Sequence, residues 1–251
     1  MKIKIASYNI SGGFYEENQK VDFFDKEKSN DIDLRLLNDI VKIIHDEDID
    51  IICFQEIITT DRIHYINRIL EQTDLKYEEH FELSPCHIIE DTECGIAILS
   101  KYPIGESIKK LFTNPMLSKT TSSGKTYYTF DKGFLLSKIM IDDKNLSVLT
   151  HHGFPFRRFH STPEDNRHIF IEFDHYIKEY QPDIITGDFN SENFLDMMHY
   201  TKENYQKTIQ DITTVDGMKF DNILLKNYIN YSEKIIQSLS DHFIVINEID
   251  I

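Results

Sequence analysis

The segment IITGDFNS, residues 184–191, sets two polar side chains directly after a short apolar run. Residues 184–186 are β-branched, which favours a strand. Asp188 and Asn190 follow this strand two positions apart, and side chains with that spacing point to the same side of an extended chain. The segment therefore predicts a carboxylate and an amide that project together from one strand end.

Polar residues occupy the ends of several other predicted strands. They are Asn9 after IKIASY, Gln55 and Glu56 after IICF, His151 and His152 after LSVLT, Asp221 before NILL, and Asp241 and His242 before FIVI. Side chains that project from strand ends onto one rim can converge although they are far apart in the sequence. The set offers carboxylates, amides and imidazoles, without a cysteine or serine nucleophile. Oxygen ligands of this kind suit Mg²⁺ or Mn²⁺, and together with a carboxylate base and histidines they can support water attack on a phosphate ester.

Predicted strands alternate with predicted helices along the chain. The strands cover residues 2–9, 50–54, 95–99, 135–141, 146–150, 184–186, 220–225 and 243–247, and the predicted loops include residues 11–31 and 112–130. Amphipathic spacing predicts a helix that begins at Asp31, and Asp61 can cap a second helix that runs through Leu70. Thr162 followed by Pro163 is a favourable start for a third helix, which should end near Tyr180. One α+β domain over residues 1–251 is the economical interpretation.

Charge and composition exclude several classes of protein. The chain carries 43 acidic against 27 basic residues, a net charge of −16 with the histidines neutral. A generic nucleic-acid-coating protein is disfavoured, because sequence-independent phosphate binding depends on lysine and arginine. An acidic chain can still act on phosphate esters where metal ions reverse the local charge. The 40% hydrophobic content over 251 residues is enough for a substantial core and excludes general disorder.

The cysteines and the first residues indicate the cellular setting. Cys53, Cys86 and Cys94 form no CxxC motif and cannot all pair, which is typical of a reducing compartment. No apolar run approaches the length of a membrane span. MKIKIASYNI has no export signal and leads directly into a predicted strand. We therefore expect a cytoplasmic protein, a monomer with no membrane span and no evident protein partner.

Seven short segments resemble a known family in their order along the chain. SYN, FQE, GIAILSKYPI, HHG, TGDFNS, FDNI and SDHF follow one another as in the endonuclease/exonuclease/phosphatase superfamily, which has the deoxyribonuclease-I-like fold. Single motifs such as QE occur by chance, whereas the ordered set from Asn9 to His242 is specific. The resemblance implies a four-layer α/β/β/α sandwich, in which two packed mixed β-sheets are flanked by helices. It also implies a metal-dependent phosphodiesterase or phosphatase.

The resemblance implies a metal site near three of the strand ends. Glu56 corresponds to the principal Mg²⁺ ligand, for which Mn²⁺ is a possible substitute. Asn9 lies beside that metal in the family, and Asp241 lies near it. Taken singly, each of these residues also fits a non-catalytic role, such as a turn former, a solvated strand end or a cap.

The resemblance also implies the residues that act on the substrate. Asp188 would orient or deprotonate the attacking water, and Asn190 would hold the phosphate or the nucleophile. His242, oriented by Asp221, would contact the phosphate and stabilise the transition state. A further histidine would bind another phosphate oxygen.

Two neighbouring histidines compete for this last role. His151 and His152 are adjacent, and neighbours on a strand point to opposite faces, so both are not expected to serve equally. His152 is favoured, because the following Gly153 allows the chain to leave the strand sharply. His151 is kept as an alternative substrate-binding residue.

Basic residues near the histidines are candidate substrate contacts. Arg157 and Arg158 follow the histidine pair in the chain's densest local positive charge, and Lys125 lies among aromatic residues in the segment 112–130. Arginines can bind a second phosphate, and basic and aromatic side chains together can hold a base. Solvated arginines and a loop packed by its own aromatic residues are the alternatives.

The sequence thus predicts a Mg²⁺-dependent phosphoesterase that hydrolyses a phosphodiester, in nucleic acid or a nucleotide, by in-line attack of a water activated by Asp188. The alternatives are a phosphomonoesterase, a phospholipid or sugar-phosphate hydrolase, and a non-catalytic binding module that retains the fold. The sequence lacks the Trp-Cys-Asp-Arg stretch of inositol polyphosphate 5-phosphatases, and it has FDN where many nucleases have Asp-Tyr.

Overall fold

A computed structural model describes residues 1–13, 34–60, 63–86, 89–122, 124–227 and 229–251. Twelve of the described strands form two six-stranded sheets. The first sheet contains, in spatial order, β13 (Tyr231–Ile236), β14 (Ile244–Asp250), β1 (Lys2–Asn9), β2 (Ile51–Ile58), β4 (Glu93–Ser100) and β3 (Tyr77–Pro85). The second contains β11 (Tyr205–Lys207), β12 (Asp221–Lys226), β10 (Ile184–Asp188), β9 (Lys144–His152), β8 (Gly133–Ile141) and β5 (Ile104–Leu111).

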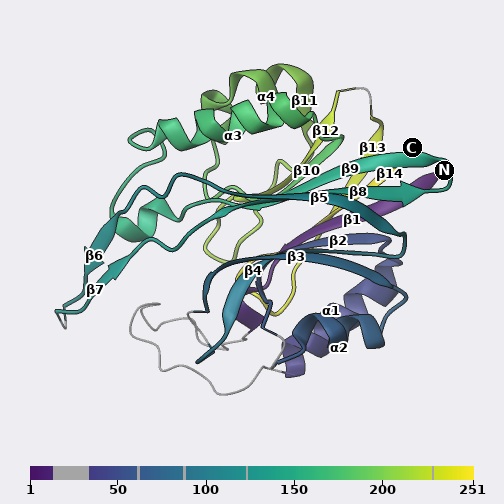
Figure 1. Cartoon of the computed structure of the whole chain (residues 1–251), viewed down its shortest axis with the longest axis horizontal. Helices are drawn as coiled ribbons and strands as arrows, with labels where there is room; N and C mark the ends of the chain where they lie inside the picture. The colour runs from purple at the N-terminus through teal and green to yellow at the C-terminus, as the bar shows by residue number, and fades with distance from the viewer. Residues whose placement is uncertain (14–33, 61–62, 87–88, 123, 228) are drawn as a thin grey trace.

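The two sheets pack against each other, and helices cover their outer faces (Figure 1). α1 (Leu34–Glu47) and α2 (Tyr65–Glu71) lie on the first sheet, and α3 (Arg167–Tyr180) and α4 (His199–Asn204) lie on the second. Each sheet mixes parallel and antiparallel pairs: β1 is parallel to β2 and β9 to β10, whereas β14 and β12 run antiparallel to their neighbours. The four-layer α/β/β/α sandwich of mixed sheets expected from the resemblance is confirmed.

The alternation of side chains along the strands explains why the chain forms layers. Ile3 and Ile5 of β1 belong to the core between the sheets, whereas Ala6 and Tyr8 belong to the core beneath α1 and α2. Successive side chains of a strand point to opposite faces, so one strand supplies two separate cores. Strands covered on both faces are rich in apolar residues, as β2 shows with the buried run IICF. Burial of this apolar surface is the main force that stabilises the sandwich.

The predicted helix start at Thr162 is wrong, because α3 begins at Arg167. The backbone N–H of Asn166 donates to the Pro163 carbonyl at 3.1 Å, and its side-chain amide donates to the Thr162 carbonyl at 2.8 Å. These local bonds form turns ahead of the helix. The end at Tyr180 agrees with the prediction. α1 is described from Leu34, and the predicted starts at Asp31 and Asp61, like most of the predicted loop 11–31, lie outside the described residues.

The predicted loop 112–130 contains a short hairpin. β6 (Ser118–Thr120) pairs with β7 (Thr126–Tyr128) in a two-stranded sheet of its own. Figure 1 shows the hairpin projecting away from the sandwich. The connecting turn contains Gly124, whose φ of +83° is one that glycine adopts without strain. The prediction missed the hairpin because strands of three residues carry too little periodicity to be recognised.

Within the described ranges, no helix combines the length and the apolar character that crossing a membrane requires.

Candidate active site

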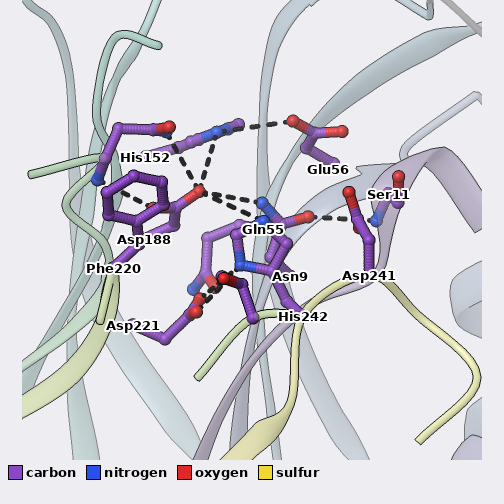
Figure 2. Close-up of polar contacts among 12 residues, drawn as sticks. Asn9, Ser11, Gln55, Glu56, His152, Asp188, Phe220, Asp221, Asp241 and His242 are labelled. Atoms are coloured by element: carbon purple, nitrogen blue, oxygen red, sulfur yellow. Dashed lines mark hydrogen bonds and ion pairs between the residues drawn. The ribbon is translucent and has the colours of Figure 1, made fainter. Parts of the chain in front are cut away.

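The polar strand ends meet at one edge of the sandwich. Asn9 ends β1, His152 ends β9 and Asp188 ends β10. Asp221 begins β12 and pairs directly with Asp188, because β12 runs antiparallel to β10. His242 comes just before β14, which runs antiparallel to β1. Strand direction in each sheet therefore brings residues from the whole chain to the same rim (Figure 2).

Asp188 lies at the centre of the polar contacts and is only 1% exposed. Its Oδ2 accepts hydrogen bonds from the side-chain amides of Asn9, at 3.1 Å, and Asn190, at 3.0 Å. Its Oδ1 accepts the backbone N–H of Asn190 at 2.8 Å. The Asn190 amide also donates to the Gly153 carbonyl at 3.1 Å, which ties the ends of β9 and β10 together. The carboxylate is thus fixed in one orientation.

The pKa of Asp188 lies near neutrality. Burial raises it to about 7, and the Asp221 carboxylate adds to the rise, whereas the His242 charge and the hydrogen bonds from Asn190 and Asn9 oppose it. A general base works best when its pKa is close to the working pH. Asp188 is therefore suited to accept a proton from a bound water.

Asp221 and His242 form a buried pair beside Asp188. His242 Nδ1 donates to Asp221 Oδ2 at 2.8 Å and lies 3.0 Å from Oδ1, while its Nε2 is 3.9 Å from Asp188 Oδ2. Burial lowers the pKa of His242, but the charges of Asp221 and Asp188 outweigh it and hold the pKa well above its ordinary value. His242 is accordingly a cation, and its Nε2–H points toward the site (Figure 2).

The two adjacent histidines lie in different environments. His152 faces the site, with Nε2 3.5 Å from Glu56 Oε1 and 3.6 Å from Asp188 Oδ2. His151 packs between the rings of Phe173 and Phe189, at centroid distances of 4.6 and 4.2 Å. His151 Nδ1 donates to the Thr186 carbonyl at 2.9 Å.

Burial also decides the charge of His151. It lowers the pKa of this imidazole to about 4, so the ring is neutral at pH 7. The structure therefore places His152 in the site and His151 in the aromatic core beneath α3. Gly153 lets the backbone pass close to Phe189 where β9 ends, because a Cβ at Gly153 would lie 2.7 Å from the Phe189 carbonyl oxygen.

Glu56 owes its position to a β-bulge. Gln55 pairs with Ile96 and Ile57 with Gly95, so Glu56 has no partner in β4, and its φ is +52°. Bulges re-aim side chains at the ends of strands. Glu56 lines the larger cavity of the site, whereas the neighbouring Gln55 turns inward and donates to Thr150 Oγ1 at 3.0 Å, linking the two sheets.

The other predicted metal ligands lie at the same rim. Asn9 Oδ1 accepts the Ser11 backbone N–H at 3.0 Å, and the Asn9 carbonyl accepts from Ser240 Oγ at 2.8 Å. Asp241 follows Ser240 and lines a second cavity. The oxygens of Glu56, Asn9 and Asp241 are hard donors of the type that Mg²⁺ prefers, so the residues present fit such an ion.

A second group of metal-ligand type is the buried cluster of Asp188, Asp221 and His242, whose ligand atoms lie within 4.8 Å of one another. In this cluster His242 Nδ1 is already bonded to Asp221. A protonated imidazole has no lone pair for a metal. The cluster is therefore better described as a hydrogen-bonded carboxylate–histidine pair beside the Asp188 carboxylate than as a complete set of metal ligands.

Two adjoining cavities open over the site. The larger has a volume of about 490 Å³ and the smaller about 360 Å³. Both are lined by Pro155, Arg158, Asn190 and His242, so they meet above the catalytic candidates. Lys125 lines the larger cavity and Arg157 the smaller, so all three predicted basic residues line the cavities over the site.

Sequence reasoning missed one residue of the site, Lys132. It lies immediately before β8, is 8% exposed, and lines the larger cavity. Gly133, the first residue of β8, pairs with His152 of β9. Only this strand register reveals that Lys132 is next to His152, because no local pattern in the sequence marks the lysine.

The raised pKa of Asp188 predicts an unusual dependence of stability on pH. An unfolded aspartate has a pKa of about 3.9, and Asp188 in the folded chain has one of about 7. Between these pH values the native state binds more protons than the unfolded state. Each unit by which the pH rises in this range therefore lowers the free energy of unfolding by about 1.4 kcal/mol. Relative to Asp188→Asn, the metal-free protein should lose stability from about pH 4 to 7. Urea unfolding of both proteins in EDTA measures this, and parallel curves would contradict it.

Comparisons with known proteins identify the family and the fold of the chain. The sequence profile of the Endonuclease/Exonuclease/phosphatase family matches residues 6–242. A search of curated proteins found no match. A solved endonuclease/exonuclease/phosphatase from Bacteroides vulgatus is similar, with a TM-score of 0.68 and 15% identity over 100% of this chain and 99% of that one.

Two further solved structures share the fold. The human Nocturnin catalytic domain with bound sulfate anion has a TM-score of 0.64 and 15% identity, covering 99% of this chain and 93% of that one. A humanized TDP2 from D. rerio has a TM-score of 0.62 and 15% identity, covering 100% and 99%. With the profile match over most of its length, the chain belongs to the endonuclease/exonuclease/phosphatase family, whose members are generally hydrolases of phosphoester bonds and typically depend on a divalent metal.

Proposed function

We propose that this protein is a Mg²⁺-dependent phosphodiesterase that acts on nucleic acid or a nucleotide by in-line attack of water. The observation that carries the proposal is the fixed, buried Asp188, which has a pKa of about 7 and lies between His242 and His152. A carboxylate base flanked by two imidazoles can accept a proton from water while the imidazoles neutralise phosphate oxygens.

Each side chain has a defined part in this proposal. Asp188 accepts the proton of the attacking water, and Asn190 holds that water or the phosphate. His242 Nε2–H donates to a phosphate oxygen, while Asp221 keeps the imidazole protonated and oriented. His152 Nε2 contacts a second oxygen. Glu56, with Asn9 and Asp241, would hold the Mg²⁺ ion, which supplies Lewis-acid stabilisation of charge on the phosphate or the leaving oxygen.

The cavities support a nucleotide or a short stretch of nucleic acid. Lys125, Arg157 and Arg158 provide positive charge around the acidic centre. Tyr127, Tyr128 and Phe130 form one wall of the larger cavity, where a base can stack. The net charge of −16 opposes extended contact with duplex nucleic acid. The size of the larger cavity, about 490 Å³, also keeps a small phosphate ester as the second candidate substrate.

Hydrolysis of two chromogenic esters tests the proposal. Bis-(p-nitrophenyl) phosphate is a diester and p-nitrophenyl phosphate a monoester, and each is assayed with Mg²⁺, with Mn²⁺ and with EDTA. We expect cleavage of the diester that needs the metal. Preference for the monoester would favour a phosphomonoesterase. Failure to cleave either ester, or any nucleotide diester tried next, would favour a binding module that retains the fold.

Glu56→Gln should raise the Mg²⁺ concentration needed for half-maximal activity. The substitution removes the negative charge from the carboxylate that we assign as principal ligand, and loss of such contacts typically weakens metal binding by about 10- to 100-fold. Turnover titrated with Mg²⁺ measures the effect. Glu106→Gln is the matched control, because Glu106 is exposed on β5 and pairs with Lys138. An unchanged Mg²⁺ requirement in Glu56→Gln would rule out the assigned metal site.

A further inference from the structure

Lys132 is a buried ammonium group in the wall of the larger cavity. Its Nζ lies 2.9 Å from His152 Nδ1 and 3.3 Å from Nε2. The residue is 8% exposed. In the part of the chain that the structure describes, the His152 ring is the only hydrogen-bond partner of this ammonium, and Lys132 forms no ion pair there.

The partner that Lys132 has does not balance its charge. His152 Nε2 lies 3.5 Å from Glu56 Oε1 and 3.6 Å from Asp188 Oδ2. Lys132 Nζ lies close to both nitrogens of the ring rather than in line with the lone pair of Nδ1 alone. An imidazole supplies no negative charge, so the described contacts leave the Lys132 ammonium without a paired anion.

Buried charges in proteins are nearly always paired, because an isolated one loses its hydration without compensation. Burial lowers the pKa of Lys132, the more distant charges of Glu56 and Asp188 raise it, and Arg158 lowers it again. Arg158 and Lys125 line the same cavity, so basic side chains surround the carboxylates of Glu56 and Asp188 there. A cavity with this arrangement is complementary to an anionic ligand.

We propose that Lys132 is a further catalytic residue, whose ammonium binds a non-bridging oxygen of the substrate phosphate. This inference rests on the proposed function of the cavity as a phosphoester site. The oxygen supplies the negative charge that Lys132 lacks, and the ammonium neutralises charge that builds up on the phosphate during attack. The contact with His152 holds the two side chains next to each other, so that both can reach oxygens of the same phosphate.

Binding of inorganic phosphate to the metal-free protein tests the proposal without turnover. Calorimetry and thermal shift in EDTA compare the wild type with Lys132→Met and Lys132→Gln. A charge-assisted hydrogen bond predicts that either change weakens phosphate binding by about 10- to 100-fold. Lys132→Gln can still donate to His152, so an equal loss in both variants assigns the effect to the charge. Lys138→Met is the matched control, because Lys138 lies on β8, the strand that follows Lys132, but is exposed and pairs with Glu106 at 2.9 Å.

Stability in the absence of phosphate distinguishes binding from a structural role. Removal of an unpaired buried charge should leave the Tm unchanged or raise it, by about 2–4 °C, in Lys132→Met. A lysine needed only for folding would lower the Tm in both variants and leave phosphate affinity intact. That result, or a wild-type protein that does not bind phosphate, would overturn the proposal.

Turnover of the diester separates this inference from the proposed function. If Lys132 is needed for phosphate binding but the wild type cleaves no phosphoester, the anion site stands and the hydrolase proposal fails. If the wild type cleaves the diester and the Lys132 variants bind phosphate normally, the hydrolase stands and Lys132 has no part in anion binding.

Discussion

Asp188→Asn is expected to lower kcat on a phosphodiester by about 10²- to 10⁴-fold, because the amide cannot accept the proton of the attacking water. Substrate affinity should change less, since the binding cations remain. Steady-state kinetics with saturating Mg²⁺ measure both parameters. A folded variant that kept nearly full turnover would show that another group activates the water.

The same substitution also alters the hydrogen bonds of the site. Oδ2 of Asp188 accepts from two side-chain amides, so an amide nitrogen placed there would face other donors. Unfolding of each variant must therefore be measured beside its turnover. Asp183→Asn is the matched control at the other end of β10, where the carboxylate accepts from Ser147 and pairs with Lys226 at 3.0 Å. That variant should lose stability but keep turnover while folded.

His242→Ala should lower kcat by about 10²- to 10³-fold, the usual cost of removing one donor that stabilises developing charge. The Nε2–H that faces the site disappears with the ring, and Asp221 is left as a buried carboxylate. Kinetics on the diester provide the measurement. His199→Ala is the control, because His199 lies exposed on α4 and should leave kcat unchanged.

Substitution of Asp221 tests whether Asp221 and His242 act as a unit. Asp221→Asn alone should also reduce kcat, because the pKa of His242 is held up mainly by Asp221. The double variant should then be little worse than His242→Ala, since groups that act together lose their effect together. Losses that multiply in the double variant would mean that the two residues act independently.

Much of the fold could be predicted because apolar patterning is a local property. The buried strand β2 has a nearly continuous apolar run, and α1 has apolar residues at helical spacing. Some strands were not predicted from the sequence, among them β5 and β13, and these lie largely exposed at sheet edges. Their sequences, IGESIKKL and YSEKII, lack a regular apolar alternation, because only part of each strand is covered.

The sequence by itself determined which polar residues end the buried strands, and the ordered motifs indicated the family. Tertiary structure decided what these residues contact. It turned His152 toward Asp188 and His151 into the aromatic core, and it placed Lys132 beside His152 through the pairing of β8 with β9. The physical reason is that patterning acts between near neighbours in the chain, whereas register and the packing of two sheets bring together groups that no local pattern connects.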